Sequence, residues 1–370
     1  MPLRILHTAD AHLGAKFLGL GEKGRLQRSQ LLETFEAVVD LAIGREVDLF
    51  LVAGDLFDSN RVPKSTLTRV ASRLEKLAAA GIEVCVSPGT HDPYGPDSVY
   101  EGPPLSGIPG LSVFKSEKMV PVHFPELDCT VYGNANMSPF QNKYPLAGFK
   151  VTDDSRWRVG MVHANFEIPD VTEDTYVVTA GQVGSSGLDY LALGHLHSLS
   201  DRSRGTVKAY YPGSPEMVRM RKGEFGNVLL VELDDEVQVS AVSVGRRFLE
   251  EVTLRAEDID SAASLKVALE AHKGPEKVLK LNIEGLRPPG YPDVAGLAGE
   301  MVDLFFHIDV TDRSTPAPAT VGPGAYPEDT PAGVYLRILH SRLEVCSASE
   351  ADEVHEAMQV GISLLLGEGD

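Results

Sequence analysis

The sequence predicts an α/β protein, and two features of its first half support that fold class. Short apolar runs at residues 3–6, 49–53 and 82–86 are typical of buried strands. Segments with apolar residues at helical spacing lie between these runs, so that strand and helix alternate along the chain. The alternation predicts parallel β-α-β units, in which functional residues gather outside the carboxyl ends of the strands.

The two intervening helices have clear apolar faces. In the first, Leu31, Phe35 and Val38 belong to a series that recurs at the spacing of one helix face. The second begins after Pro63 and ends before Gly81, and both residue types are common at such boundaries. Apolar runs at 159–162 and 190–193 predict two more strands. Further strands are expected at 130–132 and 227–233, and these two are candidates for antiparallel pairing.

The character of the chain changes near residue 245. Beyond it the pattern predicts strands at 248–254, 278–283 and 304–310 and a helix at 258–271. We therefore expect a core at 1–245, a small α/β domain at 246–313, a Pro/Gly-rich loop or linker at 314–331 and two helices at 332–370. The apolar stripes of the last two helices fit either of two uses, covering the small domain or docking a partner helix.

Composition restricts the classes of function that the chain fits. Its net charge of −19 argues against a protein that coats DNA through clustered cations, although a nuclease that uses bound metal ions remains compatible. The amino terminus lacks the pattern of a signal peptide, and no apolar run approaches the roughly 18 residues of a membrane span. Three cysteines form no spaced set. A cytoplasmic protein without structural disulfides is expected.

Five short motifs follow predicted strands and contain most of the candidate chemistry. They are Asp10-Ala11-His12, Gly54-Asp55-Leu56-Phe57-Asp58, Gly89-Thr90-His91-Asp92, Val162-His163 and Gly194-His195-Leu196-His197. Because parallel strands end at one edge of a sheet, these carboxylates and imidazoles are expected to converge. Such groups are good ligands for zinc, iron or manganese. The motifs therefore predict a metal site.

Spacing within the motifs indicates individual roles. Asp10 and His12 are two residues apart, so both side chains would point to the same side of an extended segment. Asp55 has two carboxylate oxygens and is suited to bridge two metal ions, while Asp58 is placed to orient a nearby imidazole. For any one of the motif histidines, a buried imidazole with its hydrogen bonds satisfied is a commoner explanation than a metal ligand. Five of the eleven histidines fall at strand ends, however, and this number favours a shared site. A Gly-x-Gly-x-x-Gly pattern beginning at Gly19 follows no strand, and no dinucleotide site is expected there.

The five motifs, in this order, resemble those of the calcineurin-like metallophosphoesterases. The amino-acid sequence of residues 7–14 and 53–58 is similar to that of the SbcD-type DNA repair exonuclease subunits, including their YhaO-like branch. Residues 211–216, Tyr-Pro-Gly-Ser-Pro-Glu, resemble the segment that closes the nuclease core in that family. The resemblance covers residues 1 to about 245 well and the next domain more loosely. It implies a sandwich of two mixed β-sheets flanked by helices, followed by a small α/β cap.

The resemblance also implies roles for the motif residues. One metal ion would be held by Asp10, His12, Asp55 and His197, and a second by Asp55, Thr90, His163 and His195. His91 would be the catalytic imidazole, with Asp58 or Asp92 steadying it. Two divalent ions are expected, manganese first, with iron or zinc as alternatives.

Thr90 departs from the family pattern, which has asparagine at this position. A threonine hydroxyl is one atom shorter than the asparagine amide oxygen and is a poorer neutral ligand. The sequence therefore predicts a weakened second metal site.

Three functions remain open at this stage. The first is a metal-dependent phosphodiesterase that cuts DNA ends as an exonuclease or endonuclease, together with an SMC-like ATPase of the SbcC type. The second is a phosphoesterase for a small phosphodiester or nucleotide. The third is a scaffold of low activity that docks the ATPase through residues 331–370. A homodimer is a further expectation, and a membrane association is not expected.

Overall fold

The computed structural model describes residues 2–139, 143–167, 176–219, 225–288, 291–316, 322 and 324–365. Its contacts divide the chain into two compact units, residues 1–248 and 249–370. The sequence predicts a boundary at 245, close to this division. All five motifs lie in the first unit.

One sheet of the first unit has six strands in the order β14-β13-β1-β2-β3-β4. They are β1 (Leu3–Thr8), β2 (Leu49–Val52), β3 (Glu83–Val86), β4 (Leu111–Val113), β13 (Asn227–Leu233) and β14 (Val237–Ser243). Strands β1 to β4 pair in parallel, whereas β13 runs antiparallel to both β1 and β14. The carboxyl ends of β1, β2 and β3 therefore meet at one edge.

The other sheet also has six strands, in the order β11-β12-β10-β7-β6-β5. They are β5 (Val120–Phe124), β6 (Cys129–Gly133), β7 (Trp157–His163), β10 (Tyr190–Gly194), β11 (Ser200–Asp201) and β12 (Lys208–Tyr211). The strand expected at 130–132 is β6, which pairs antiparallel with β5 but parallel with β7. A separate short pair is formed by β8 (Asn165–Phe166) and β9 (Val177–Val178). Two mixed sheets confirm the predicted fold class.

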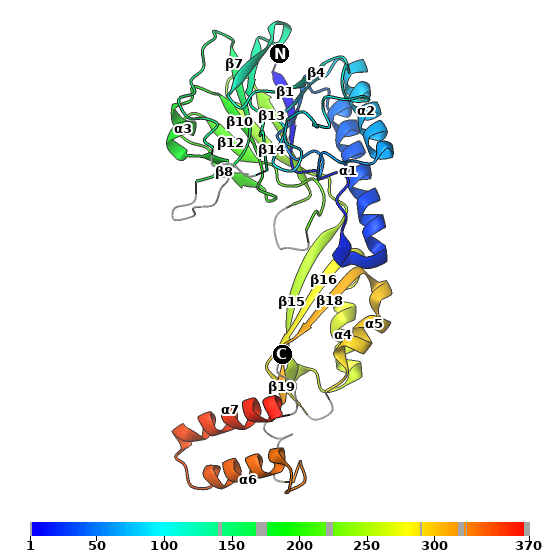
Figure 1. Cartoon of the computed structure of the whole chain (residues 1–370), viewed down its shortest axis with the longest axis vertical. Coiled ribbons are helices and arrows are strands. Elements are labelled where there is room, and N and C mark those ends of the chain that lie inside the picture. The colour runs from blue at the N-terminus through cyan, green and yellow to red at the C-terminus, as the bar shows by residue number, and fades with distance from the viewer. Residues whose placement is uncertain are drawn as a thin grey trace. The chain divides into compact units, whose positions relative to one another are not determined.

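Three helices accompany these sheets (Figure 1): α1 (Gly24–Gly44), α2 (Lys64–Ala79) and α3 (Ala180–Ser185). Helices α1 and α2 are those expected from the apolar spacing. Short 3₁₀ turns lie at Leu18–Lys23 and Pro125–Leu127. The glycine pattern that begins at Gly19 lies in the first of these turns and ends at Gly24, the first residue of α1, so that it does not directly follow a strand.

The period-two alternation of β1 assigns its side chains to two different cores. Leu6 packs with Phe35 of α1 in a core between the first sheet and its helices. Ile5 packs instead with Met161 of β7 and Tyr190 of β10, in a core that lies between the two sheets. A third core, around Leu191, covers the other face of the second sheet. The sheets are therefore packed face to face with apolar side chains between them.

The second unit is built on a three-stranded sheet. Its elements are β15 (Phe248–Arg255), α4 (Ala262–Ala271), β16 (Gly274–Glu284), β17 (Leu286–Arg287), α5 (Val294–Glu300), β18 (Phe305–Asp312), β19 (Thr315–Pro316), α6 (Pro331–Leu343) and α7 (Ala348–Leu365). Single 3₁₀ turns precede α4 and β18, at Ala256–Asp258 and Val302–Leu304. Leu265 of α4 and Val294 of α5 share a core with the sheet, while Leu336 of α6 and Met358 of α7 share a smaller one. Within the described residues, no helix is long and apolar enough to cross a membrane.

Candidate metal centre

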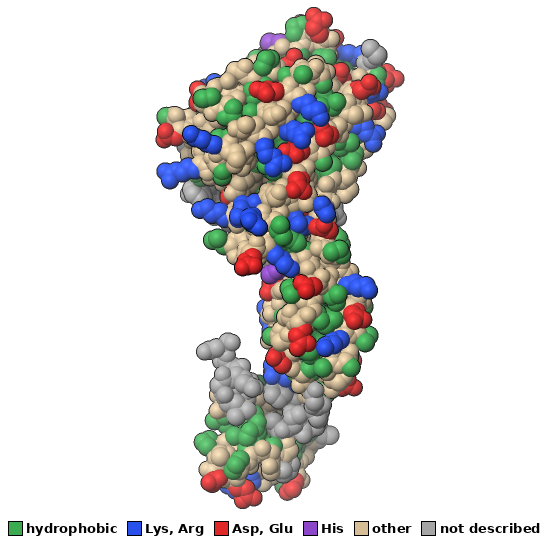
Figure 2. All heavy atoms as spheres, turned by 90° about the vertical axis from the view of Figure 1, so that its right-hand side faces the viewer, with side chains coloured by type: hydrophobic (Ala, Val, Ile, Leu, Met, Phe, Trp, Pro, Cys, Tyr) green, Lys and Arg blue, Asp and Glu red, His purple; other side chains and the backbone are tan. Residues whose placement is uncertain are grey.

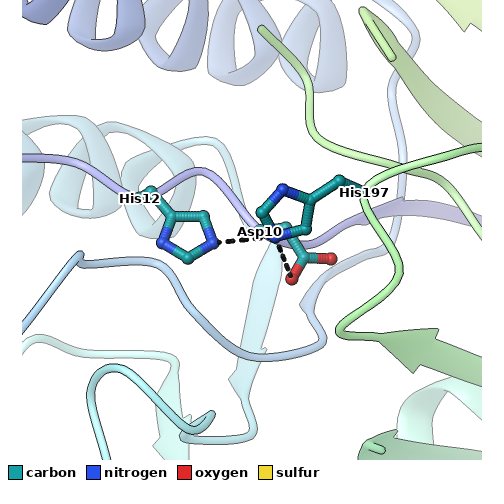
Figure 3. A group of neighbouring side chains, drawn as sticks. All are labelled: Asp10, His12 and His197. Atoms are coloured by element: carbon teal, nitrogen blue, oxygen red, sulfur yellow. Dashed lines mark hydrogen bonds and ion pairs between the residues drawn. The ribbon is translucent and has the colours of Figure 1, made fainter. Parts of the chain in front are cut away.

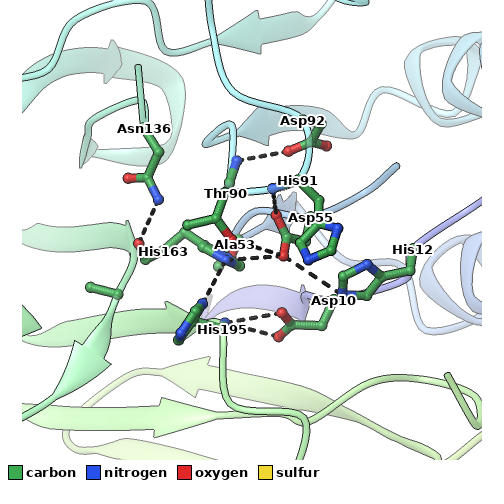
Figure 4. A network of polar contacts seen from close by, with 12 residues as sticks. Asp10, His12, Ala53, Asp55, Thr90, His91, Asp92, Asn136, His163 and His195 are labelled. Atoms are coloured by element: carbon green, nitrogen blue, oxygen red, sulfur yellow. Dashed lines mark hydrogen bonds and ion pairs between the residues drawn. The ribbon is translucent and has the colours of Figure 1, made fainter. Parts of the chain in front are cut away.

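The motif residues converge where strands of both sheets end (Figure 4). Asp10 follows β1 and Asp55 follows β2, so both come from the first sheet. His163 is the last residue of β7, and His195 directly follows β10, so both come from the second. The site is thus assembled across the two packed sheets.

Local backbone geometry directs these side chains inward. Asp10, His12, Asp55 and His195 have positive φ angles of 54°, 45°, 49° and 105°, a region that costs free energy for residues other than glycine. The amide of Asp10 donates to Gly54 O at 3.0 Å and that of His12 to Asp55 O at 2.9 Å, which holds the two loops together. The segment at Asp10 is therefore not extended as expected, because a left-handed turn, and not strand alternation, places its side chains on one side.

Glycines in three motifs are required by close packing at the site. Gly54 has a φ of 90°, and a Cβ there would overlap the His163 imidazole. A Cβ on Gly89 would overlap the Asp55 carboxylate, and one on Gly194 would overlap the Ala53 carbonyl. The strand ends can approach each other only because these positions lack side chains.

The first group of ligand atoms comprises Asp10, His12 and His197 (Figure 3). The Nε2 atoms of His12 and His197 lie 3.1 Å apart. Asp10 Oδ1 is 3.8 Å from His197 Nε2, and Asp55 Oδ2 is 3.6 Å from His12 Nε2. Two imidazole nitrogens and two carboxylate oxygens therefore face a common point.

A second group lies on the other side of Asp55. His163 Nε2 is 3.2 Å from Asp55 Oδ2 and 3.3 Å from His195 Nδ1. The hydroxyl of Thr90 lies 3.4 Å from the same Asp55 oxygen. The other oxygen, Oδ1, accepts a hydrogen bond from the His91 amide at 2.8 Å, which fixes the carboxylate. Asp55 is therefore placed between both groups.

Burial and neighbouring charges set the protonation of these residues. Burial raises the pKa of Asp10 to about 6. Burial disfavours the charged forms of Asp55 and His163, but their mutual attraction outweighs it, raising the pKa of His163 to about 9 and holding the pKa of Asp55 well below its usual range. Burial lowers the pKa of His195 to about 4 and that of His197 to about 3. Both imidazoles are consequently neutral near pH 7.

This donor set fits two divalent cations. Neutral imidazole nitrogens and carboxylate oxygens suit zinc, iron and manganese. His163 Nδ1 donates to Ala53 O at 2.9 Å, and this bond leaves Nε2 as the ligating nitrogen once its proton is lost. On the far side, Asn136 donates to His163 O at 2.9 Å. The sequence marks Asn136 only as the first residue of a chance Asn-x-Ser pattern, and not as part of the site, although it is almost completely buried.

His91 and Asp58 lie beside the first group. His91 Nδ1 is 3.1 Å from the Asp58 carbonyl oxygen, so it donates, and Nε2 is left as the ring nitrogen for a substrate. The Asp58 carboxylate lies nearer to His12 Nδ1, at 3.3 Å, than to His91 Nδ1, at 3.8 Å. Asp58 therefore orients mainly His12 and holds His91 through its backbone.

Of the two residues expected to steady His91, Asp58 or Asp92, the second makes its hydrogen bonds elsewhere. Asp92 is fully buried and accepts hydrogen bonds from the amides of Phe57 and Gly89, at 3.0 and 2.7 Å, and from the hydroxyl of Tyr100. Its carboxylate is occupied in joining the loops after β2 and β3. Adjacency to His91 in the sequence does not bring the two side chains together.

Comparison with known proteins identifies relatives of this chain. Residues 3–199 match the family model of the calcineurin-like phosphoesterases. A metallophosphoesterase, YhaO of Bacillus subtilis, is 28% identical over 62% of this chain and 57% of its own length. The DNA double-strand break repair proteins Mre11 of Methanopyrus kandleri and Aeropyrum pernix are 26% and 29% identical over 76% and 66% of this chain.

The chain spans 57% of the length of YhaO and 68% and 61% of the two Mre11 proteins. The family match covers more than half of the chain and includes all five motifs. The site is assembled from the residues of those motifs, and its donor set fits the divalent metals of a phosphoesterase. The chain therefore belongs to the calcineurin-like phosphoesterase family.

Proposed function

We propose that this protein hydrolyses phosphodiester bonds of DNA with two divalent cations, manganese first among them. The observation behind this proposal is the convergence of two groups of imidazoles around one carboxylate, Asp55, at the joined edges of both sheets. Two ions sharing such a carboxylate are typical of enzymes that clamp a phosphoryl group. The Mre11 relatives, named as DNA break repair proteins, favour DNA over other phosphoesters.

The residues of the chain support the chemistry of such a hydrolysis. Bound at Asp10, His12, Asp55, Thr90, His163, His195 and His197, two cations would stabilise negative charge on the phosphoryl oxygens and acidify a water molecule. His91 lies beside them, with Nδ1 committed to the Asp58 carbonyl. Its Nε2 can therefore donate a hydrogen bond to a phosphoryl oxygen or a proton to the leaving oxygen.

The acidic composition is compatible with this proposal. On the face shown in Figure 2, basic and acidic side chains of the described residues are interspersed instead of gathered by sign. Cations bound at the metal centre would offset part of the net charge of −19 for an approaching strand.

A partner is proposed for the helices α6 and α7. Their shared core is small, and Ile338, Val345 and Leu364 remain 60%, 77% and 65% exposed. Ile338 of α6 and Leu364 of α7 are therefore available for contact with a partner helix. We propose that an SMC-like ATPase of the SbcC type binds there, as the resemblance of the core implies. Co-purification with such an ATPase should be lost in Ile338→Asp and retained in Arg45→Gln.

The nuclease activity is tested with manganese-loaded protein on linear single-stranded DNA and on bis-p-nitrophenyl phosphate. The wild type should cleave both, and His91→Ala should lower kcat by about 10²–10⁴-fold, the usual contribution of a positioned acid or base. His355→Ala, a histidine of α7, is the matched control.

Metal content by elemental analysis completes the experiment, and His91→Ala should keep it. Full activity in that variant would contradict the assignment of His91. Cleavage of the dye ester alone would instead indicate a small phosphodiester as the substrate, and silence on both with metal bound would indicate a scaffold.

A further inference from the structure

The cleft at the metal centre has a wall that none of the five motifs supplies. It has a volume of about 310 Å³, and Asp55, His91 and His195 line one part of it. Ser214, Arg219 and Phe225 line another part. They are not among the expected metal ligands or catalytic residues. These three side chains lie on the loops between β12 and β13.

Ser214 provides a buried hydroxyl that lacks a partner. The residue is 1% exposed, and its Oγ makes no hydrogen bond with the described residues. Its backbone is held on both sides, because its amide donates to His197 O at 3.3 Å and its carbonyl accepts from Gly226 N at 2.7 Å. A buried hydroxyl without a partner costs free energy, so a ligand oxygen would satisfy it.

Arg219 provides an exposed guanidinium at the same cleft. Among the described residues, none forms an ion pair with it. Burial, followed by the charges of His12 and Arg219, lowers the pKa of His197, which agrees with the guanidinium lying close to that ligand. A planar cation in this place suits a phosphate oxygen.

The loop that presents these groups is anchored by a buried carboxylate. Glu216 is fully buried and accepts hydrogen bonds from the amide of Met217 at 2.9 Å and the hydroxyl of Thr34 at 2.9 Å. Gln27 of α1 donates to Met217 O at 2.7 Å. Residues 216 and 217, between Ser214 and Arg219, are therefore held in place, which helps to preorganise this side of the cleft.

Phe225 adds an aromatic ring to a wall that otherwise offers a hydroxyl and a cation. This combination matches one nucleotide, whose phosphate takes charged and hydroxyl donors and whose base stacks on an aromatic ring. A mononucleotide ester or a dye ester has no second nucleotide to fill it.

We propose that Ser214, Arg219 and Phe225 form a subsite for the nucleotide next to the scissile bond. The proposal rests on the proposed function and deepens it. The subsite makes the substrate a polynucleotide strand, because binding energy at the neighbouring nucleotide is gained only when the chain continues beyond the reacting phosphate.

The test compares kcat/KM on a single-stranded oligothymidylate with that on bis-p-nitrophenyl phosphate, both with manganese. Arg219→Gln and Phe225→Ala should each lower the ratio of the two values by roughly tenfold, the effect of losing one charged or stacking contact. Ser214→Ala should lower it by a smaller factor. Arg45→Gln, which removes the same charge just before the amino end of β2, should leave the ratio as in wild type.

A binding measurement in EDTA separates the subsite from catalysis. Fluorescence anisotropy of the labelled oligothymidylate should give a log–log salt slope lower by about 0.7 in Arg219→Gln, the value for one lost contact to a single strand. An unchanged ratio in Arg219→Gln and Phe225→Ala would overturn the subsite, even if the wild type cleaves DNA. A wild type that cleaves only the dye ester would instead overturn the proposed function.

Discussion

At Thr90 the chain offers a hydroxyl 3.4 Å from the Asp55 oxygen that also faces His163. We expect this hydroxyl to be a ligand of the second cation, although its side chain is shorter than that of asparagine. We expect manganese titrated into the metal-free protein to fill one tight and one weaker site, because a hydroxyl is a poorer ligand than an amide oxygen. Calorimetry should resolve the two steps.

Thr90→Asn is the informative variant. Its amide oxygen should tighten the second step by about tenfold, a factor that one improved ligand can supply, and should leave the first unchanged. Two equally tight sites in the wild type would contradict the prediction.

Protons should leave the site when metal binds. His163 has a pKa raised to about 9 by Asp55 against the effect of burial, so its imidazole is protonated at pH 7 and must lose a proton to ligate. Metal affinity should therefore rise with pH up to about 9 and level off above it. Below pH 6 the protonation of Asp10, whose pKa burial raises to about 6, should weaken binding further.

Proton release is measured by calorimetry of manganese binding at pH 7 in two buffers with different ionisation enthalpies. With one proton released per ion bound at the second site, the two observed heats should differ by close to the difference between the ionisation enthalpies of the two buffers. Equal heats in both buffers would show that His163 is already neutral.

At the scale of elements, the glycines of the strand-end motifs bring loops into contact. Gly54→Ala should place a Cβ into the His163 ring and force a positive φ on alanine, which together should destabilise the first unit by more than about 1 kcal/mol. Gly44→Ala, at the end of α1 with no atom within 4 Å of the new Cβ, is the control.

Thermal melting and metal stoichiometry check this prediction. Gly54→Ala should lower both the midpoint and the amount of metal bound, whereas Gly44→Ala should change neither by much. A Gly54→Ala protein with wild-type metal content would show that the loops have room that the structure does not.

The elements most directly predicted from sequence are those whose burial follows a simple period. Leu31, Phe35 and Val38 form one face of α1, and the apolar runs became β1, β2 and β3 because both their faces are covered. The short helices α3 and α5 were missed, since they bury few residues. The residues just before them were a signal in the sequence, because Thr179 and Asp293 are of the types that cap helices. In the structure the Thr179 hydroxyl accepts a hydrogen bond from the Gln182 amide, and the Asp293 carboxylate accepts one from the Gly296 amide.

Sequence predicts a site residue well when it directly follows a strand. It predicts the residue's role poorly when that role depends on contacts with other loops. Asp10, Asp55 and His163 follow from strand ends alone. The role of Asp92 depends on Phe57 and Tyr100, which reach it from other segments, and spacing along the chain says nothing about such contacts. For the same reason, the sequence places Ser214 within the segment 211–216 but does not indicate that its side chain lines the cleft.

At the scale of the whole molecule, the first unit contains every expected ligand and three apolar cores of its own. We therefore expect residues 1–248 produced alone to fold, bind manganese and hydrolyse bis-p-nitrophenyl phosphate. Circular dichroism, elemental analysis and the dye assay measure these three properties. An unfolded or metal-free fragment would show that residues 249–370 are needed to complete the core.

Asp10 and Asp55 follow strands of one sheet, while His163, His195 and His197 lie at or after the ends of strands of the other. Cations bound among them would link the two sheets. A change in the position of one sheet relative to the other would therefore change the affinity for metal. A substitution such as Met161→Ala, in the core between the sheets and two residues before His163 on β7, would then affect metal binding by leaving a cavity that the sheets partly close. We therefore expect the dissociation constant for metal to report on the packing of the two sheets against each other.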